Sequence, residues 1–264
     1  MALFRALESG RRPAAARLPL VGGAVARLID RRWPGARTSA VARTRLIDDA
    51  VLAALAEGVG QVLILGAGFD CRAYRLPGIE RARVFEIDHP ATSAAKRTRL
   101  AALLDAPPSH VTFVAVDFDR QPLLAALDAA GCDRTVPSLV VWEGVSNYLA
   151  AAAVDATLRD LATFAAGSRI LFTYVHRGVL DGSVPFVGAE RIAATVQRAG
   201  EPWTFGLDPT EVPAYLAARG LALVDDVGAD EYRARLLGDA GRGYAFYRVV
   251  QARVAGDHGH GGAR

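Results

Sequence analysis

Short apolar runs alternate with longer segments of helical periodicity along most of the chain. The runs VLIL at 62–65 and VFEI at 84–87 end at a glycine and at an aspartate, respectively. Runs of this length and composition are typical of strands buried in a parallel sheet. The same pattern predicts strands at 62–65, 84–87, 111–116, 138–142, 169–175, 221–227 and 244–254.

Helices are predicted in the segments around these strands. Residues 38–57 give the clearest pattern, because Ser39 suits an N-cap and Gly58 stops a helix that has a continuous apolar face. Pro90 suits the first turn of another helix. The further helices are predicted at 90–104, 121–130, 150–166, 188–199 and 209–219. Such alternation favours an α/β fold with helices on both faces of one sheet.

The alternation stops at residues 177–208, which are rich in glycine and proline. This insertion carries three aromatic residues, Phe186, Trp203 and Phe205. Following the fifth strand, it is placed where a substrate lid would cover a binding site. The predicted organisation is a helical extension at 1–37, one α/β domain at 38–254 and a disordered tail at 255–264.

Composition narrows the class of protein. The 264 residues are 52% hydrophobic, enough for one domain with a sizeable core. The net charge is +3 and arginines alternate with acidic residues, which argues against a nucleic-acid surface. No apolar stretch reaches the roughly twenty residues that cross a bilayer. Cys71 and Cys132 form no disulfide framework or zinc pattern, so we expect a cytoplasmic protein that binds neither metal nor membrane.

The strongest candidate site is the turn after residues 62–65. Gly66 and Gly68 lack a Cβ, so a ligand can approach their backbone closely. Asp88 lies about twenty residues further on, at the end of the next strand, where a carboxylate suits the paired hydroxyls of a ribose. These features predict a nucleoside-containing cofactor at the carboxyl ends of the strands.

The type of cofactor follows from the charges around it. The sequence GAGFDC lacks the third glycine of the dinucleotide fingerprint, which weakens an NAD assignment without excluding it. Acidic residues follow four successive strands: Asp70, Asp88, Asp117 and Glu143. Carboxylates would repel a pyrophosphate but suit the cationic sulfonium and amino groups of S-adenosylmethionine. The charges therefore favour methyl transfer over hydride transfer.

The motifs QVLILGAGFDCRAYRL, VFEIDHP, VDFD and VVWEGVSNYL, in this order and spacing, resemble the leucine carboxyl methyltransferase family. The likeness extends from about residue 40 to residue 253 and is greatest to the bacterial branch of small-molecule O-methyltransferases, which includes a polyketide carboxyl methyltransferase. It implies the class I methyltransferase fold, a Rossmann-like doubly wound sheet that is mostly parallel with an antiparallel last strand. It also implies S-adenosylmethionine as the cofactor.

The resemblance assigns the methionine end of the cofactor to two charged residues. Arg43 matches the arginine that grips the methionine carboxylate, with Arg45 as its neighbouring competitor. Glu143 matches a strand-end acid near the methionine part. Asp70 is a further member of the site, whose side chain often braces the turn in such proteins.

The resemblance assigns the nucleoside to the earlier strands. Gly66 and Gly68 would lie under the ligand, and Asp88 matches the acid that binds the ribose. Asp117, with the backbone of Phe118, matches the pair that binds adenine.

The catalytic residues depend on the acceptor. A carboxylate is ionised near neutral pH and needs no base, whereas a phenol has a pKa of about 10 and benefits from one. His176, after the fifth strand, is the candidate base, Tyr174 is a second candidate, and Arg177 could steer a carboxylate. We therefore expect an O-methyltransferase acting on a carboxylate or phenolic hydroxyl of a small molecule, in secondary metabolism. An NAD(P)-dependent oxidoreductase and a catalytically silent S-adenosylmethionine-binding protein are the alternatives.

Overall fold

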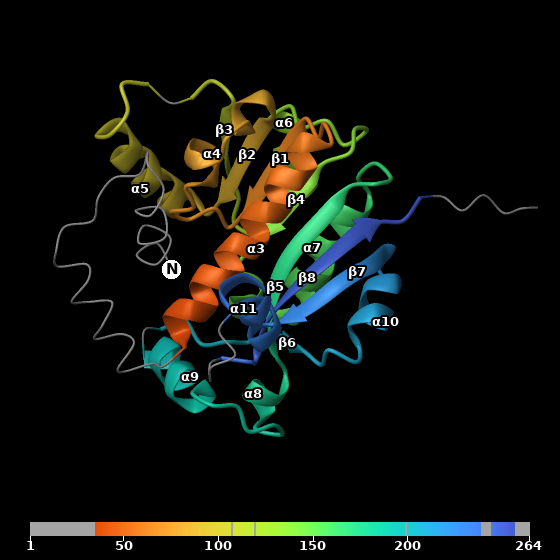
Figure 1. The fold of residues 1–264 in the computed structure, drawn as a ribbon. Coiled ribbons are helices and arrows are strands. Elements are labelled where there is room, and N and C mark those ends of the chain that lie inside the picture. The colour runs from red at the N-terminus through yellow and green to blue at the C-terminus, as the bar shows by residue number, and fades with distance from the viewer. Residues whose placement is uncertain (1–34, 107, 119, 199, 239–243, 257–264) are drawn as a thin grey trace, which may run out of the picture.

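The computed structural model describes residues 35–256 except 107, 119, 199 and 239–243. Its centre is one mixed sheet in the order β3-β2-β1-β4-β5-β8-β7, with the short β6 beside the end of β5 (Figure 1). The strands are β1 (Gln61–Leu65), β2 (Arg83–Asp88), β3 (Val111–Ala115), β4 (Leu139–Trp142), β5 (Arg169–His176), β6 (Gly206–Leu207), β7 (Leu221–Gly228) and β8 (Tyr247–Val254). Among the described strands, β8 alone runs antiparallel to its neighbours, β5 and β7. The predicted doubly wound sheet with an antiparallel last strand is confirmed.

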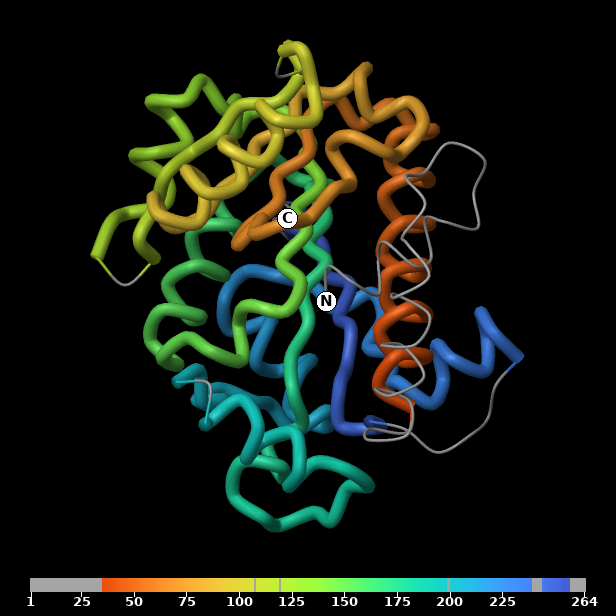
Figure 2. The backbone as a smooth tube through the Cα atoms, turned by 90° about the vertical axis from the view of Figure 1, so that its left-hand side faces the viewer, coloured from red at the N-terminus to blue at the C-terminus, as the bar shows by residue number. Residues whose placement is uncertain are grey.

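Helices cover both faces of this sheet. The described helices are α3 (Ala36–Ala56), α4 (Arg72–Arg75), α5 (Pro90–Ala101), α6 (Leu123–Ala129), α7 (Ala151–Ala162), α8 (Gly178–Asp181), α9 (Ala189–Arg198), α10 (Val212–Ala217) and α11 (Ala229–Leu237), with single 3-10 turns η1 (Ile79–Arg81) and η2 (Ser146–Tyr148). Helices α3 and α11 stand together on one side of the strands, and α6, α7 and α10 stand on the other (Figure 2). No helix in the described ranges combines the length and apolar character that a bilayer crossing requires.

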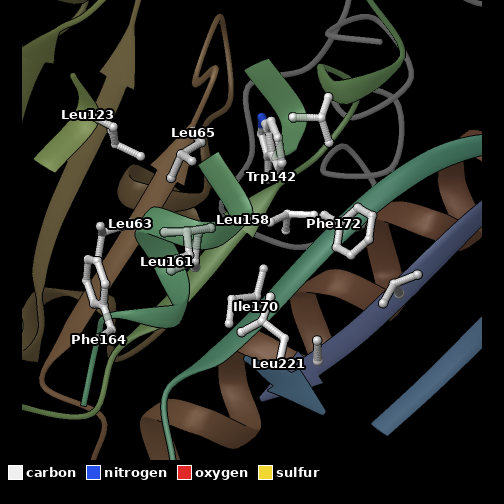
Figure 3. Packing of buried hydrophobic residues seen from close by; sticks show 14 of the residues in the cluster. Leu63, Leu65, Leu123, Trp142, Leu158, Leu161, Phe164, Ile170, Phe172 and Leu221 are labelled. Atoms are coloured by element: carbon white, nitrogen blue, oxygen red, sulfur yellow. The ribbon is translucent and has the colours of Figure 1, made fainter. Parts of the chain in front are cut away.

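Each face has its own hydrophobic core, because all five residues of β1 are buried. On the α7 face, Leu158 and Leu161 lie among side chains from β1, β4 and β5 (Figure 3). The Trp142 and Phe172 rings, on paired strands, have centroids 6.3 Å apart. On the other face, apolar residues of α3 and α11 pack over the opposite side of the same strands. The sheet is thus held rigidly on both sides, and its strand ends present fixed positions.

The predicted elements differ from the observed ones mainly near the carboxyl terminus. Helix α11 was not predicted, because Arg233 on its buried side breaks the apolar pattern. The last strand begins at Tyr247 rather than at residue 244, because Tyr244 and Phe246 pack with Val175 and Ala189 in a separate hydrophobic cluster. The helix predicted at 150–166 ends at Ala162. The predictions for residues 1–34 and 257–264 lie outside the described residues.

Candidate active site

The carboxyl ends of β3, β2, β1 and β4 lie side by side, because these parallel strands are neighbours in that order. The chain order of the strands reverses between β1 and β4, and such sheets bind ligands in the crevice outside that reversal. Gly66 and Gly68 follow β1 with φ angles of 61° and 45°, in the left-handed region that suits glycine. A Cβ at Gly66 would lie 2.2 Å from Cγ2 of Val145. The turn after β1 therefore touches the segment after β4.

Asp88 joins the end of β2 to the glycine turn. Its Oδ2 accepts a hydrogen bond from the Gly68 N–H, and its Oδ1 accepts one from the His89 N–H at 2.6 Å. The side chain is only partly buried, and each carboxylate oxygen can accept a further hydrogen bond. Asp117, with Phe118 beside it, follows the neighbouring strand β3. The predicted nucleoside residues therefore share one edge of the sheet.

A network of buried charges lies next to this edge. Arg43 on α3 donates from Nε to Oε1 of Glu143 at 3.0 Å. Nη1 of Arg72 lies 2.8 Å from Oε2 of the same glutamate and 2.5 Å from Oδ2 of Asp70. Nε of Arg72 also donates to Oδ1 of Asp48 at 2.8 Å. The structure thus brings the predicted Arg43, Asp70 and Glu143 together with two residues that were not predicted.

Burial and charge act in opposite directions on these arginines. Burial opposes the charged form of Arg72, but Asp70, Glu143 and Asp48 outweigh it and raise the pKa of the guanidinium. Burial likewise opposes the charged form of Arg43, but the effects of Tyr247 and Glu143 outweigh that of burial, so the pKa of Arg43 is also raised. Both arginines therefore stay charged, and the carboxylates that they face are neutralised within the protein.

This pairing changes the electrostatic interpretation of the strand ends. The sequence alone predicts one acidic rim, formed by Asp70, Asp88, Asp117 and Glu143. In the structure Asp70 and Glu143 are buried against Arg72 and Arg43. Asp88 and Asp117 are the members that are only partly buried. The site is therefore acidic on its nucleoside side and nearly balanced in charge on the side of Arg43.

Arg45, the competitor of Arg43, faces another element. Its Nη1 donates to the carbonyl oxygen of Leu236 in α11 at 3.5 Å. Of the two, Arg43 is the one beside Glu143 and in the wall of the cavity described below.

Lys96 on α5 holds the end of the glycine turn at Asp70. Its Nζ donates to the carbonyl oxygen of Asp70 and pairs with Oε2 of Glu86, both at 2.7 Å. The hydroxyl of Tyr74 donates to the same glutamate oxygen at 3.1 Å. Burial raises the pKa of Glu86 to about 7, although Lys96 favours its charged form.

This carboxyl group makes stability depend on pH. Between its ordinary pKa of 4.5 and about 7, Glu86 keeps its proton in the folded protein but releases it in the unfolded chain. Its contribution to the free energy of unfolding is therefore fully present below this range and is lost as the pH rises through it. We expect the free energy of unfolding, measured with urea from pH 4.5 to 8, to fall relative to Glu86→Gln by on the order of 2 kcal/mol. Parallel curves for the two proteins would contradict this.

A cavity of about 320 Å³ opens beside Arg43. Most of its wall is apolar or aromatic, with contributions from α3, η2, α9 and the segment before β8. The described residues that line it are Ala36, Ser39, Ala40, Arg43, Gly144, Tyr148, Ile192, Val196, Trp203, Tyr244, Phe246 and Tyr247. The Arg43 guanidinium carbon stands 4.3 Å from the centre of the Tyr247 ring. Arg43 therefore forms the boundary between the strand-end site and this cavity.

The insertion supplies part of the cavity wall. Helices α8 and α9 gather beyond the end of β5 (Figure 1), and Trp203 lines the cavity. The segment after Trp203 is fixed to η2, because Thr204 donates to the Asn147 carbonyl oxygen at 2.8 Å. Phe186 instead packs on His176, and Phe205 is buried in the main core. Of the three predicted aromatic residues, Trp203 is the one in the wall.

The predicted catalytic residues lie outside the described cavity wall. Nδ1 of His176 accepts a hydrogen bond from the Gly178 N–H at 2.9 Å. Tyr174 is fully buried and donates from its hydroxyl to Oδ2 of Asp226 at 2.7 Å. Arg177 forms an exposed pair with Glu211, with N–O distances of 2.8 and 2.7 Å. The structure therefore gives these three side chains local structural partners.

Sequence reasoning missed Asp48, Arg72 and the aromatic wall before β8. The sequence held a signal for Asp48, because the polar residues Ser39, Arg43, Thr44 and Asp48, all buried in α3, recur at helical spacing. Polar residues repeated on a predicted core face indicate buried partners, because an unpaired buried charge is costly.

Comparisons with known proteins identify the family of the chain. The profile of the leucine carboxyl methyltransferase family matches residues 11–162. A candidate S-adenosyl-L-methionine-dependent methyltransferase of Mycobacterium sp. (strain JLS) is 38% identical over 192 residues, covering 68% of this chain and 60% of the relative. A Streptomyces coelicolor protein described in the same way is 36% identical, covering 70% and 72%. The chain thus spans about 60% of the length of the mycobacterial relative.

Solved structures share the fold. A candidate methyltransferase from Thermobifida fusca has a TM-score of 0.65 at 21% identity, covering 97% of this chain and 94% of that one. Magnesium protoporphyrin IX methyltransferase from Synechocystis, solved with bound S-adenosylhomocysteine, has a TM-score of 0.53 at 13% identity, covering 94% and 93%. These likenesses confirm the methyltransferase fold class.

Proposed function

Because the chain belongs to the leucine carboxyl methyltransferase family, we propose that it transfers a methyl group from S-adenosylmethionine to the carboxylate of a small, largely apolar molecule. Both the carboxylate acceptor and its apolar character are part of this proposal. A cytoplasmic location and a role in secondary metabolism are predictions from the sequence.

The residues at the strand ends fit this cofactor. Its methionine end carries a carboxylate and an ammonium group, which Arg43 and Glu143 match in charge. Its ribose carries two hydroxyls, and Asp88 offers a partly accessible carboxylate. Among the described residues, a Cβ at Gly68 would meet Gly66 O and Asp88 Oδ2, at 3.8 and 3.9 Å, so no side chain blocks a close approach to this glycine. Asp117 and the Phe118 backbone are proposed for adenine.

The observation that carries the choice of acceptor is the lining of the cavity. Its described residues include no aspartate, glutamate or histidine, and Arg43 is their one cation. Tyr244 and Tyr247 offer no base near neutral pH, since burial raises the pKa of Tyr244 to about 12 and also raises that of Tyr247. An acceptor in this cavity must arrive ionised, as a carboxylate does.

Bound S-adenosylmethionine supplies an electrophilic methyl group next to a sulfonium. The protein's part is to align donor and acceptor and to exclude water, which strengthens the attraction between an anionic nucleophile and a cation. Trp203, Tyr244, Phe246 and Tyr247 provide the apolar wall. Arg43 can hold the cofactor at the mouth of this cavity. His176, Tyr174 and Arg177 have no step assigned to them in this mechanism.

The proposal is tested first by binding. Calorimetric titration should give micromolar dissociation constants for S-adenosylmethionine and S-adenosylhomocysteine and no heat with NADH. Binding of NADH alone would favour the oxidoreductase alternative. Binding of S-adenosylmethionine without turnover on any acid or phenol would favour a silent binding protein.

The acceptor is tested with matched pairs of apolar carboxylic acids and phenols that share one carbon skeleton. Products are detected by mass spectrometry before and after mild alkali, which cleaves methyl esters but not aryl methyl ethers. We expect alkali-labile products from the acids. Alkali-stable products from the phenols alone would contradict carboxyl methylation.

Replacing Asp88 by alanine should weaken S-adenosylhomocysteine binding about 10- to 100-fold, the effect of losing one or two charge-assisted hydrogen bonds. Calorimetry measures the change, and a thermal melt shows whether the variant is folded. A dissociation constant equal to that of the original protein would mean that the ribose is held elsewhere.

A further inference from the structure

Arg72 is the most fully buried charged side chain of the strand-end network, at 1% exposure. It follows the glycine turn on the short helix α4. Its backbone N–H donates to Oδ1 of Asp70 at 2.8 Å, and its guanidinium reaches Asp48, Asp70 and Glu143 at 2.5 to 2.8 Å. One side chain thus connects α3, the turn after β1 and the end of β4.

Glu143 is held by two arginines through different oxygens. Oε1 faces Nε of Arg43 at 3.0 Å, and Oε2 faces Nη1 of Arg72 at 2.8 Å. The two arginines differ in their surroundings. Arg43 lines the cavity, whereas Arg72 is anchored behind Glu143 by Asp48 and Asp70.

This difference matters when a zwitterion enters. A ligand with a carboxylate and an ammonium group competes for both members of the Arg43–Glu143 pair. If Arg43 turns to the ligand carboxylate, Glu143 loses one of the two arginines that contact it among the described residues, while it must stay charged to receive the ammonium group. An uncompensated buried carboxylate would take up a proton or move, because burial disfavours its charge.

We propose that Arg72 is the positioning residue of the methionine end: it keeps Glu143 ionised and in place while Arg43 exchanges Glu143 for the cofactor carboxylate. This inference rests on the proposed function and assigns a role to a residue that does not itself touch the cofactor. The planar guanidinium suits the task, because its separate donors can hold Asp48, Asp70 and Glu143 in fixed directions at once. A lysine at this position keeps the charge but not that geometry.

The test compares two probes that differ only at the methionine end. S-adenosylhomocysteine has the amino and carboxylate groups, and methylthioadenosine has neither. In Arg72→Lys we expect the dissociation constant of S-adenosylhomocysteine to rise about tenfold, the effect of weakening one charge-assisted hydrogen bond. That of methylthioadenosine should change by less than about twofold. An equal loss for both probes would overturn the proposal in favour of a general structural role.

Arg75→Lys is the matched control. Arg75 binds the same Asp48, with N–O distances of 2.7 and 2.8 Å. Among the described residues its other side-chain hydrogen bond goes to Sγ of Cys71, and none goes to Glu143. We expect it to leave the ratio of the two dissociation constants unchanged. The same change of ratio in both variants would overturn the proposal, since it would reflect the charge network as a whole.

A double-variant cycle asks whether Arg72 acts through Glu143. In a Glu143→Gln background, Arg72→Lys should raise the dissociation constant of S-adenosylhomocysteine by less than about twofold. If the two residues acted independently, Arg72→Lys would raise it by the same factor as in the original protein. If a thermal melt shows that Arg72→Lys is unfolded, Asp70→Asn replaces it, because this change weakens the contact that holds Nη1 of Arg72. We expect Asp70→Asn to raise the dissociation constant of S-adenosylhomocysteine more than that of methylthioadenosine, and equal losses for both probes would overturn the proposal. Failure of the original protein to bind either probe would instead reject the proposed function.

Discussion

Replacing Asp48 by alanine should lower the free energy of unfolding by about 3 kcal/mol, because the change leaves two arginines without a shared buried partner. Asp48 is 2% exposed and lies 2.8 Å from Nε of Arg72 and 2.7 Å from Nη1 of Arg75. Both arginines keep other partners, but the local charge becomes unbalanced where solvent cannot screen it. Urea unfolding measures the loss.

The control for this variant is Asp128→Ala. Asp128 forms a similar pair with Arg134 at 2.9 Å, but its side chain is 50% exposed, and exposed pairs contribute less than about 1 kcal/mol. Equal losses in the two variants would show that the burial of the Asp48 network adds nothing to stability.

Replacing Gly66 by alanine should cost about 3 kcal/mol and abolish tight cofactor binding. The left-handed φ of 61° accounts for about 1 kcal/mol of this, and overpacking against Val145 for the rest. The new Cβ would stand 2.2 Å from Cγ2 of Val145, whose branched side chain has few alternative rotamers. The turn after β1 and the segment after β4 must then move apart, which displaces both parts of the site.

Two variants separate the causes. Gly58→Ala has a similar backbone strain, with φ of 89° and no heavy atom within 4 Å of the added Cβ, so it should cost only about 1 kcal/mol. Val145→Ala in the Gly66→Ala background should restore part of the stability and of the S-adenosylhomocysteine affinity. No recovery would show that the backbone conformation, and not the contact, causes the loss.

The sequence predicted the sheet well, because residues of a buried strand carry their burial in their own apolar character. It also predicted which residues lie at the strand ends, since parallel strands bring all those ends to one edge. Asp88 beside Gly68 is an example, joined across twenty residues by a hydrogen bond. Helix α11 escaped prediction because Arg233 interrupts its apolar pattern, and its packing on α3 is not visible in its local sequence.

The partners of the strand-end acids could not be found in the same way. Arg43 lies one hundred residues from Glu143, and Arg72 lies twenty-four from Asp48. No local spacing links such residues, and a carboxylate whose charge is neutralised looks the same in sequence as an accessible one. The acidic character of the site was therefore overestimated until the folded chain placed the arginines.

Lys96 gives the protein a built-in reporter. It is the only lysine of the chain, it is 5% exposed, and its amine holds the backbone oxygen of Asp70 at the glycine turn. A reagent that acylates primary amines therefore has a single side-chain target, Lys96, beside the terminal amine, and we expect Lys96 to react when this turn opens. The rate of acylation at Lys96, followed by the mass of the peptide that contains it, would report openings of the glycine turn without any engineered label, and it should slow as ligand occupies the site.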